Sequence, residues 1–113
     1  MSLIKERTYI LNNASTAVTK KLRADILDII EKVIRESNPY KIVKKAIHIN
    51  TAGKMTVQGK FKLDLNTFKR ILVIGAGKGT YEMARATEEL LGKRITDGFI
   101  TIGALQTDCK LKI

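Results

Sequence analysis

The candidate functional residues of this chain are concentrated in one short glycine-rich segment, Gly75-Ala76-Gly77-Lys78-Gly79-Thr80. Glycines at alternate positions let the backbone approach a ligand closely and adopt positive φ angles. Lys78 adds a full positive charge, and Thr80 could cap a following helix or donate its hydroxyl. The free N–H groups at a helix start attract phosphate or carboxylate. We therefore expect the segment to bind an anionic ligand.

The flanking residues predict the elements that would position this segment. Ile71-Leu72-Val73-Ile74 is a continuous apolar run that ends in glycine, typical of a central parallel strand buried on both faces. Residues 79–91 have helical spacing, and Gly92 follows as a C-terminal cap. A turn at Thr96-Asp97-Gly98 leads to a second buried strand, Phe99 to Gly103. The pattern predicts one right-handed parallel βαβ crossover, and ligands bind at the carboxyl end of such strands.

Upstream residues predict two helices. We expect residues 1–18 to form a loosely ordered arm or turn. From Thr19 to Arg35, apolar residues recur at three- and four-residue steps and are expected to share one inward face. These residues are Leu22, Ile26, Ile29, Ile30, Val33 and Ile34. A shorter helix is expected from Pro39 to His48, capped by Ser37 or Asn38.

Residues 51–65 change to a period of two, which predicts extended structure. A turn near Gln58-Gly59 would divide the segment into a β-ribbon. The chain of 113 residues allows one domain. The predicted fold class is α/β, a Rossmann-like parallel βαβ preceded by two helices and a β-ribbon. We expect an N-terminal arm over 1–18 and an incomplete domain over 19–113, because Leu111-Lys112-Ile113 resembles the opening of another strand.

The charge balance bears on possible partners. Lys plus Arg is 21 against 11 acidic residues, a formal net charge of +10. Such an excess can indicate a nucleic-acid partner. Here the lysines are scattered as singles and pairs without an aromatic stacking platform, which favours a solvated surface. A basic nucleic-acid or anion-binding domain is kept as an alternative.

The cysteine and histidine content excludes some other classes. Cys109 is the only cysteine, so no internal disulfide can form, and with His48 as the only histidine no metal-ligand set is recognisable. We expect His48 at a helix end or on the surface, and Cys109 as an incidental thiol. Residues 1–11 lack the apolar run of a signal peptide, and no stretch approaches a membrane span. The expected location is the cytoplasm, without a membrane partner; a homo-oligomer is left open.

Two common nucleotide-binding motifs fit the glycine-rich segment incompletely. In the dinucleotide pattern G-x-G-x-x-G, Gly75 and Gly77 match, but the third position holds Thr80 and no acidic residue ends the next strand. In the phosphate-loop pattern G-x-x-x-x-G-K-[ST], the first glycine position holds Leu72 and the residue after Lys78 is Gly79. The segment is thus several residues too short for a phosphate loop, and a dinucleotide-binding oxidoreductase module stays an alternative.

A longer series of motifs resembles the N-terminal part of the glycerate 2-kinase family, whose members often carry the label hydroxypyruvate reductase and pair this part with a MOFRL domain. The matching stretches follow in order: Ile71 to Lys78, Met83-Ala84, Glu88-Glu89-Leu90-Leu91-Gly92, and Asp97 to Ile102. The helices around Leu27 to Ile30 and Ser37-Asn38-Pro39 also fit. Gly79-Thr80 departs from the family's usual Ala-Ala, and the residues from Ala104 onward match poorly.

The resemblance implies a transferase, a kinase that uses ATP and Mg²⁺ to phosphorylate the 2-hydroxyl of glycerate. It implies that Lys78 is a catalytic residue that helps to hold glycerate and the transferring phosphoryl group. Gly75, Ala76, Gly77, Gly79 and Thr80 would form the substrate or phosphate-binding loop around it. Because the family's later motifs are missing, we expect the 113-residue chain to be inactive alone.

Overall fold

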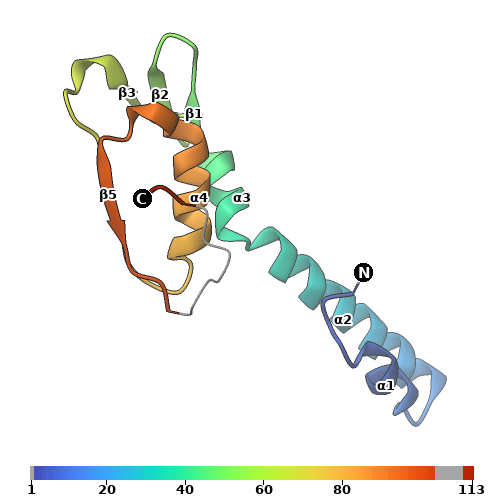
Figure 1. Ribbon diagram of the computed structural model, residues 1–113. Helices are drawn as coiled ribbons and strands as arrows, with labels where there is room; N and C mark the ends of the chain where they lie inside the picture. Colours follow the sequence, from blue (N-terminus) through green and yellow to red (C-terminus); the bar gives the residue numbers. More distant parts are fainter. Residues whose placement is uncertain (1, 104–110) are drawn as a thin grey trace. The chain divides into compact units, whose positions relative to one another are not determined.

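The computed structural model describes residues 2–103 and 111–113, and it confirms the α/β class. The chain packs as two compact units, an N-terminal unit (Met1–Ser37) and a C-terminal unit (Asn38–Ile113). Figure 1 shows the elements of each. The predicted division at residue 18 stays a prediction. In the described part of the chain, no helix has both the length and the apolar character needed to cross a membrane.

The N-terminal unit consists of two helices, α1 (Arg7–Asn12) and α2 (Ala17–Glu36). The Thr16 hydroxyl caps α2 by accepting a hydrogen bond from the Thr19 N–H at 3.1 Å. Helix α1 lies where a loosely ordered arm was expected, so that prediction was wrong over these residues. With six residues, α1 is too short to show a helical period in the sequence.

The covered side of α2 also differs from the expected one. Leu27 is its buried residue, and all six apolar residues predicted to face inward are exposed. Contacts to the segment before α2 lie on the Leu27 side: Arg7 pairs with Asp28 at 2.6 Å, and the Arg23 guanidinium donates to the Ile10 carbonyl at 2.7 Å. The helical period identified a shared apolar face correctly, but this face has no covering element within the unit.

The C-terminal unit opens with α3 (Pro39–Ala46), which has Pro39 in its first turn and the Asn38 side chain as its cap, as predicted. The helix ends two residues early, because Ile47–Ile49 form strand β1. Strand β1 pairs antiparallel with β2 (Lys54–Val57), and β2 pairs with β3 (Phe61–Asp64). The expected ribbon is therefore a three-stranded sheet.

A parallel pair follows, as predicted. Strand β4 (Leu72–Gly75) pairs in parallel with β5 (Asp97–Ile100), and α4 (Thr80–Leu91) connects them. Gly92 ends α4 with a φ of +52°, which confirms the predicted glycine cap. The turn predicted at Thr96-Asp97-Gly98 was wrong. The chain reverses earlier, in the 3₁₀ helix η2 (Gly92–Arg94), and the Thr96 N–H already donates to the Ile71 carbonyl at 2.8 Å.

The core of the C-terminal unit lies where α3, α4 and the sheets meet. Val43 of α3, Leu65 of the 3₁₀ helix η1 (Leu65–Thr67), and Ala84 and Ala86 of α4 are buried. Small residues allow α4 to approach its neighbours closely, and α3 packs beside it (Figure 1).

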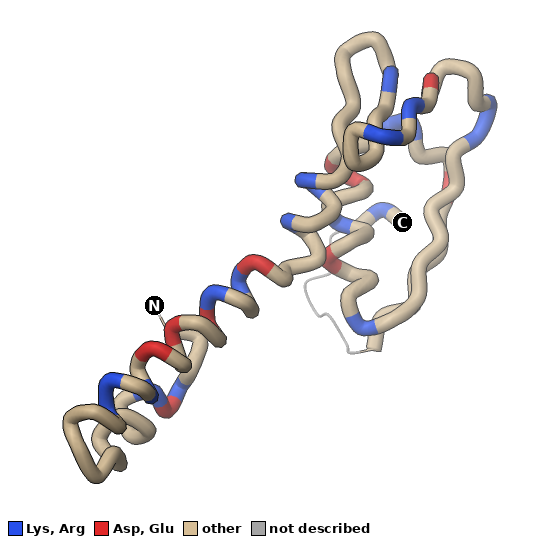
Figure 2. The backbone as a smooth tube through the Cα atoms, turned by 180° about the vertical axis from the view of Figure 1, so that it is seen from behind, with Lys and Arg blue, Asp and Glu red and all other residues tan. Residues whose placement is uncertain are grey.

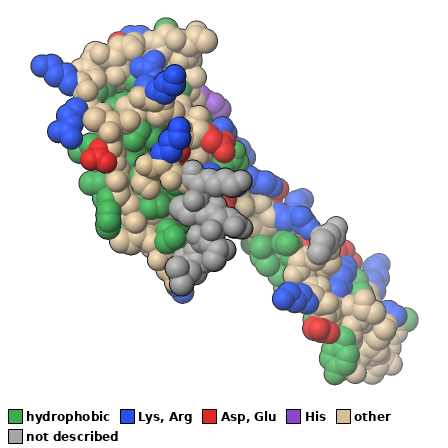
Figure 3. Space-filling view, viewed as in Figure 1, with side chains coloured by type: hydrophobic (Ala, Val, Ile, Leu, Met, Phe, Trp, Pro, Cys, Tyr) green, Lys and Arg blue, Asp and Glu red, His purple; other side chains and the backbone are tan. Residues whose placement is uncertain are grey.

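The β4–β5 pair is covered on one face among the described residues, not on both as expected. Its exposed side chains are Leu72, Ile74 and Phe99, with exposed fractions of 53%, 80% and 67%. Hydrophobic side chains are accordingly visible at the surface over this unit in Figure 3. A continuous apolar run does not show in the sequence whether both faces of the strand are covered. Among the described elements, α4 is the helix that packs on this two-stranded sheet.

Candidate functional site

The glycine-rich segment forms a sharp turn at the carboxyl end of β4. Gly75 is the last residue of this strand, and its carbonyl accepts a hydrogen bond from the Thr101 N–H at 2.9 Å. Gly77 has a φ of +117°, a value that side-chain-bearing residues rarely adopt. Gly79 occupies the N-cap position of α4 and offers no side-chain cap. The turn thus leads directly from the sheet into the start of α4, as the sequence predicted.

Thr80 does not cap the helix, contrary to one expected role. It is the first helical residue, it is buried, and its N–H donates to the Gly77 carbonyl at 3.2 Å. A Cβ at Gly75 would lie 2.7 Å from the Thr80 Cγ2. Gly75 and Thr80 therefore serve the packing of the turn, because the threonine methyl fills the space that the glycine leaves.

The groups that remain available to a ligand are backbone amides and one lysine. The amides of Gly77, Lys78 and Gly79 make no hydrogen bond within the described part of the chain. Lys78 is exposed, and no described residue forms an ion pair or hydrogen bond with it. Helix α4 adds the partial positive charge of its N-terminus. This arrangement can bind a carboxylate or phosphate through neutral N–H donors and one ammonium group.

The described residues provide no ready-made set of ligands for a divalent metal ion at the turn. Among residues 2–103 and 111–113, no group of three or more His, Cys, Asp or Glu side chains is placed to hold one. The acidic residue in the first turn of α4 is Glu82, and it pairs with Arg85 at 2.9 Å. The described residues thus do not form a complete Mg²⁺ site by themselves. In kinases, one or two carboxylates commonly hold Mg²⁺ together with the phosphates of the substrate.

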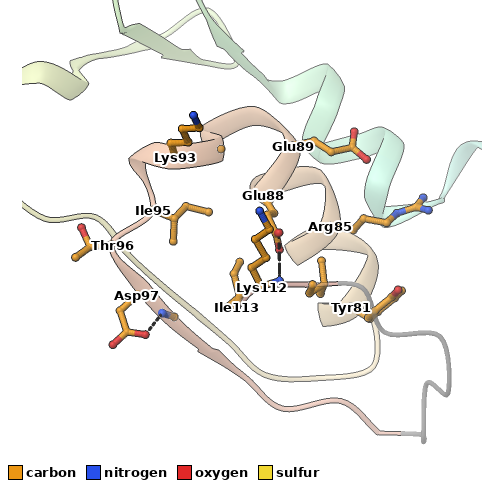
Figure 4. Close-up of a pocket in the computed structure, with 13 residues that line it drawn as sticks. Tyr81, Arg85, Glu88, Glu89, Lys93, Ile95, Thr96, Asp97, Lys112 and Ile113 are labelled. Atoms are coloured by element: carbon orange, nitrogen blue, oxygen red, sulfur yellow. Dashed lines mark hydrogen bonds between the residues drawn. The ribbon is translucent and has the colours of Figure 1, made fainter.

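A separate pocket of about 630 Å³ lies along α4, with lining residues from Tyr81 to Gly92. Figure 4 shows its lining, which includes Glu88, Asp97 and Lys112 but none of the residues of the glycine turn. The Lys112 N–H donates to the Glu88 carboxylate at 2.9 Å, and the Gly98 N–H donates to Asp97 at 2.8 Å. Its walls come from α4, the following residues up to Gly98, and residues 111–113, and no local sequence motif predicts this combination. We favour the turn as the functional site because its amides have no partner among the residues that the structure describes.

A polar cluster joins α3 to α4 near the middle of the unit. The Tyr40 hydroxyl donates to a Glu89 carboxylate oxygen at 2.5 Å, and the Lys44 ammonium lies 3.5 Å from the same oxygen. The Arg85 guanidinium stacks 4.3 Å from the centroid of the Tyr40 ring. The hydrogen bond from Tyr40 lowers the pKa of Glu89 below its usual value, and the same bond raises the pKa of Tyr40. We interpret this cluster as structural, since it lies between two packed helices.

The remaining candidate residues take no part in the turn. His48 is exposed in the middle of β1, which confirms a surface position but not a helix end. Cys109 lies outside the described residues. Basic and acidic residues are interspersed along both units (Figure 2), so the backbone trace shows no continuous basic stripe.

The fold and the turn together define an α/β protein with a candidate anion site at the carboxyl end of a parallel strand. Residues 25–112 match the family described as a domain of unknown function (DUF4147), and the chain belongs to this family. The same domain is the N-terminal domain of glycerate kinase-like, MOFRL-associated proteins, which agrees with the resemblance drawn from the motifs. No curated protein and no solved structure matches the chain.

Proposed function

We propose that this chain supplies the substrate-binding turn of a glycerate 2-kinase-like phosphotransferase, with Lys78 as the residue that contacts the anionic part of glycerate or of the transferring phosphoryl group. The observation that carries the proposal is that the amides of Gly77, Lys78 and Gly79, at the start of α4, have no hydrogen-bond partner among the described residues. Membership of a family that forms the N-terminal domain of glycerate kinase-like proteins supports this choice of substrate.

The chemistry of the turn follows from its charges. Glycerate carries a carboxylate, and a phosphoryl group in transfer carries charge on its non-bridging oxygens. Fixed N–H donors stabilise such charge without having to reorganise. Lys78 adds a mobile ammonium group, exposed at the turn, that can neutralise the same charge. These groups bind and orient an anion, and none of them is a base for the glycerate hydroxyl.

The other parts of a kinase site are not found among the described residues. ATP is expected as the phosphoryl donor, and Mg²⁺ as its usual companion, on the strength of the resemblance. The open apolar face of β4 and β5 supports an active site completed by further structure, because this face would pack against it. We therefore expect no turnover from the 113-residue chain alone. Turnover with glycerate and ATP in a coupled assay would contradict this expectation.

Binding to the turn can be tested on the chain as it is. We expect D-glycerate and inorganic phosphate to shift the amide NMR signals of Gly77, Lys78 and Gly79 more than signals elsewhere. Replacing Lys78 with Ala should weaken the binding about tenfold, which corresponds to the loss of one charge-assisted contact. The matched control is Lys93→Ala, which removes the same charge at η2, away from the turn. Equal effects of the two variants, or shifts confined to other residues, would overturn the proposal.

Catalysis can be tested in an active enzyme that contains this domain. There, the Lys78→Ala change should lower kcat by about 100-fold or more, because a charge that develops in the transition state loses its partner. Full activity of this variant would assign Lys78 a surface role.

The described residues do not favour the alternatives. Thr80, at the third position of the dinucleotide pattern, is buried and fills the space beside Gly75. Both the dinucleotide module and the nucleic-acid-binding domain stay predictions without structural support.

A further inference from the structure

Helix α2 carries a row of apolar side chains that no other described part of its unit covers. Leu22, Ile26, Ile29 and Val33 have exposed fractions between 55% and 62%, and we call them the α2 seam. At about 100° per residue they occupy an arc of roughly 60° on the helix. The buried Leu27 lies on the opposite side. Helix α2 is thus amphipathic, with its apolar side outward.

The spacing of the α2 seam is that of a coiled coil. The steps between successive members are four, three and four residues, the alternation of the a and d positions of a heptad. In this register Ile26 and Val33 take a positions, and Leu22 and Ile29 take d positions. Such a row packs most closely against another helix with the same spacing. A second copy of α2 provides that spacing.

The charges beside the α2 seam determine the direction of the second copy. Asp25 and Lys32 both occupy g positions. In a parallel pair, the g position faces the next e position of the partner, which places Asp25 against Ile30 and Lys32 against Ser37. In an antiparallel pair g faces g, so that Asp25 of each copy faces Lys32 of the other. The opposite charges then meet twice across the symmetric interface.

The apolar layers agree with the antiparallel arrangement. In this register, core residues of the two copies that face each other have numbers that sum to 55. Ile26 therefore lies opposite Ile29 and Leu22 opposite Val33, and the two-fold symmetry repeats each pair once. Residues at g positions that face each other have numbers that sum to 57, and Asp25 and Lys32 meet this condition. One symmetric arrangement therefore buries all four members of the α2 seam and pairs both charges, as a two-fold interface requires.

We propose that the chain forms an antiparallel homodimer through the α2 seam. A lipid surface fits this helix less well, because Asp25 and Asp28 accompany its basic residues, whereas membrane-surface helices carry mainly Lys and Arg beside their apolar face. The proposal is independent of the anion site, since α2 belongs to the N-terminal unit and the glycine turn to the C-terminal unit.

The experiment measures the mass of the whole chain by sedimentation velocity over a range of concentrations. We expect a reversible change from monomer to dimer. Asp25→Lys and Lys32→Asp should each weaken the dimer by about threefold to thirtyfold, because two attractive pairs become repulsive. The double variant exchanges the charges and should return the dissociation constant to within about twofold of the original.

A matched control separates pairing from net charge. Lys21→Asp changes the net charge of the same helix as much as Lys32→Asp does, but from a c position away from the α2 seam. It should leave dimerisation nearly unchanged. Far-UV circular dichroism confirms that each variant keeps its helices. A monomer at every concentration, or a double variant that stays as weak as the singles, would overturn the proposal.

The direction of the helices has its own test. A spin label at Val18→Cys, in a chain in which Cys109 is replaced by Ser, marks one end of α2. In the antiparallel dimer the two labelled positions lie about 19 residues apart along the axis, or about 28 Å. In a parallel dimer the backbones at these positions lie about 10 Å apart. A short label-to-label distance would exclude the antiparallel arrangement.

Discussion

Gly75 and Thr80 illustrate how a glycine in a binding turn can be required for packing and not for contact with a ligand. A methyl group at Gly75 would lie 2.7 Å from the Thr80 Cγ2 and 3.3 Å from the Ile100 Cγ2. Both neighbours belong to structured elements, so neither can move freely. At Gly77 the reason for glycine is different, since its φ of +117° disfavours any side chain.

We predict that Gly75→Ala lowers the free energy of unfolding by about 1–3 kcal/mol, the usual cost of overpacking. Denaturant unfolding monitored by circular dichroism measures the loss. A second change, Thr80→Ser, removes the methyl group that the new Cβ meets, so the double variant should regain part of the stability.

The control for this prediction is Gly103→Ala. An added Cβ at Gly103 meets no atom within 4 Å, so its effect should stay within about 0.5 kcal/mol, as for other surface substitutions. A destabilisation at Gly103 as large as that at Gly75 would contradict the packing argument.

At the scale of elements, α3 and α4 are held together by polar contacts as well as by their buried side chains. The hydrogen bond from Tyr40 to Glu89 crosses between the two helices. It stabilises the charged carboxylate of Glu89 and the protonated hydroxyl of Tyr40. The pKa of Glu89 is therefore lower in the folded protein than its usual 4.5, and the pKa of Tyr40 is higher than its usual 10.0.

The direction of the pH dependence follows from these shifts. For Glu89, whose pKa falls on folding, the stabilisation is present above pH 4.5 and is lost as the pH falls through the lower folded value. For Tyr40, whose pKa rises on folding, it is present below pH 10 and is lost as the pH rises through the higher folded value. We predict that Tyr40→Phe lowers the melting temperature between these limits and that the deficit shrinks outside them.

Thermal unfolding at pH 3, 7 and 11 measures this effect against Tyr81→Phe. Tyr81 is a half-buried tyrosine of α4 whose hydroxyl forms no hydrogen bond with a described residue, so removing this hydroxyl should give no comparable pH dependence. A deficit in Tyr40→Phe that stays constant across the three pH values would show that the hydrogen bond does not couple to folding.

The sequence predicted elements best where a local signal marks their ends. Asn38 and Pro39 marked the start of α3, Gln58 and Gly59 the turn between β2 and β3, and Gly92 the end of α4. Strand β1 was missed because three residues, Ile47 to Ile49, are too few to establish a period of two against the preceding helix. Its pairing with β2 determines its conformation, and that contact is not local in the sequence.

The candidate site was predicted only in part, because some of its features depend on contacts that are not local in the sequence. The glycine spacing located the turn and the start of α4 within one residue. It could not distinguish the glycine that packs, Gly75, from the glycine that needs a positive φ, Gly77. The burial of Thr80 was also hidden, because it depends on packing within the folded unit, including the space that Gly75 leaves beside it.

At the scale of the whole molecule, apolar surface is unusually exposed. The open face of the β4–β5 pair carries Leu72, Ile74 and Phe99, and the α2 seam adds a second apolar surface in the other unit. Exposed apolar surface of this extent indicates interaction sites or a tendency to aggregate. Alternation along β4 separates the two faces sharply, since Val73 is half-buried while Ile74 is 80% exposed.

We predict that Ile74→Thr changes the free energy of unfolding by less than about 0.5 kcal/mol, because the exposed Ile74 side chain makes few packing contacts. It should reduce the binding of an apolar fluorescent dye and raise the solubility of the chain. Val73→Thr is the matched control, since it introduces the same hydroxyl group one residue earlier on the covered face. There we expect a loss of about 1–3 kcal/mol, and equal losses at both positions would show that the two faces are similarly covered.

The two sheets also differ in how far apart their paired residues lie along the chain. In the antiparallel sheet, β2 and β3 join partners such as Val57 with Phe61 and Lys54 with Asp64. In the parallel sheet, Leu72 pairs with Asp97, and a whole helix lies between them. Closing a loop costs conformational entropy that grows with its length. Among the strand pairs that the structure describes, the pair that positions the candidate site is therefore the one whose closure costs the chain the most entropy.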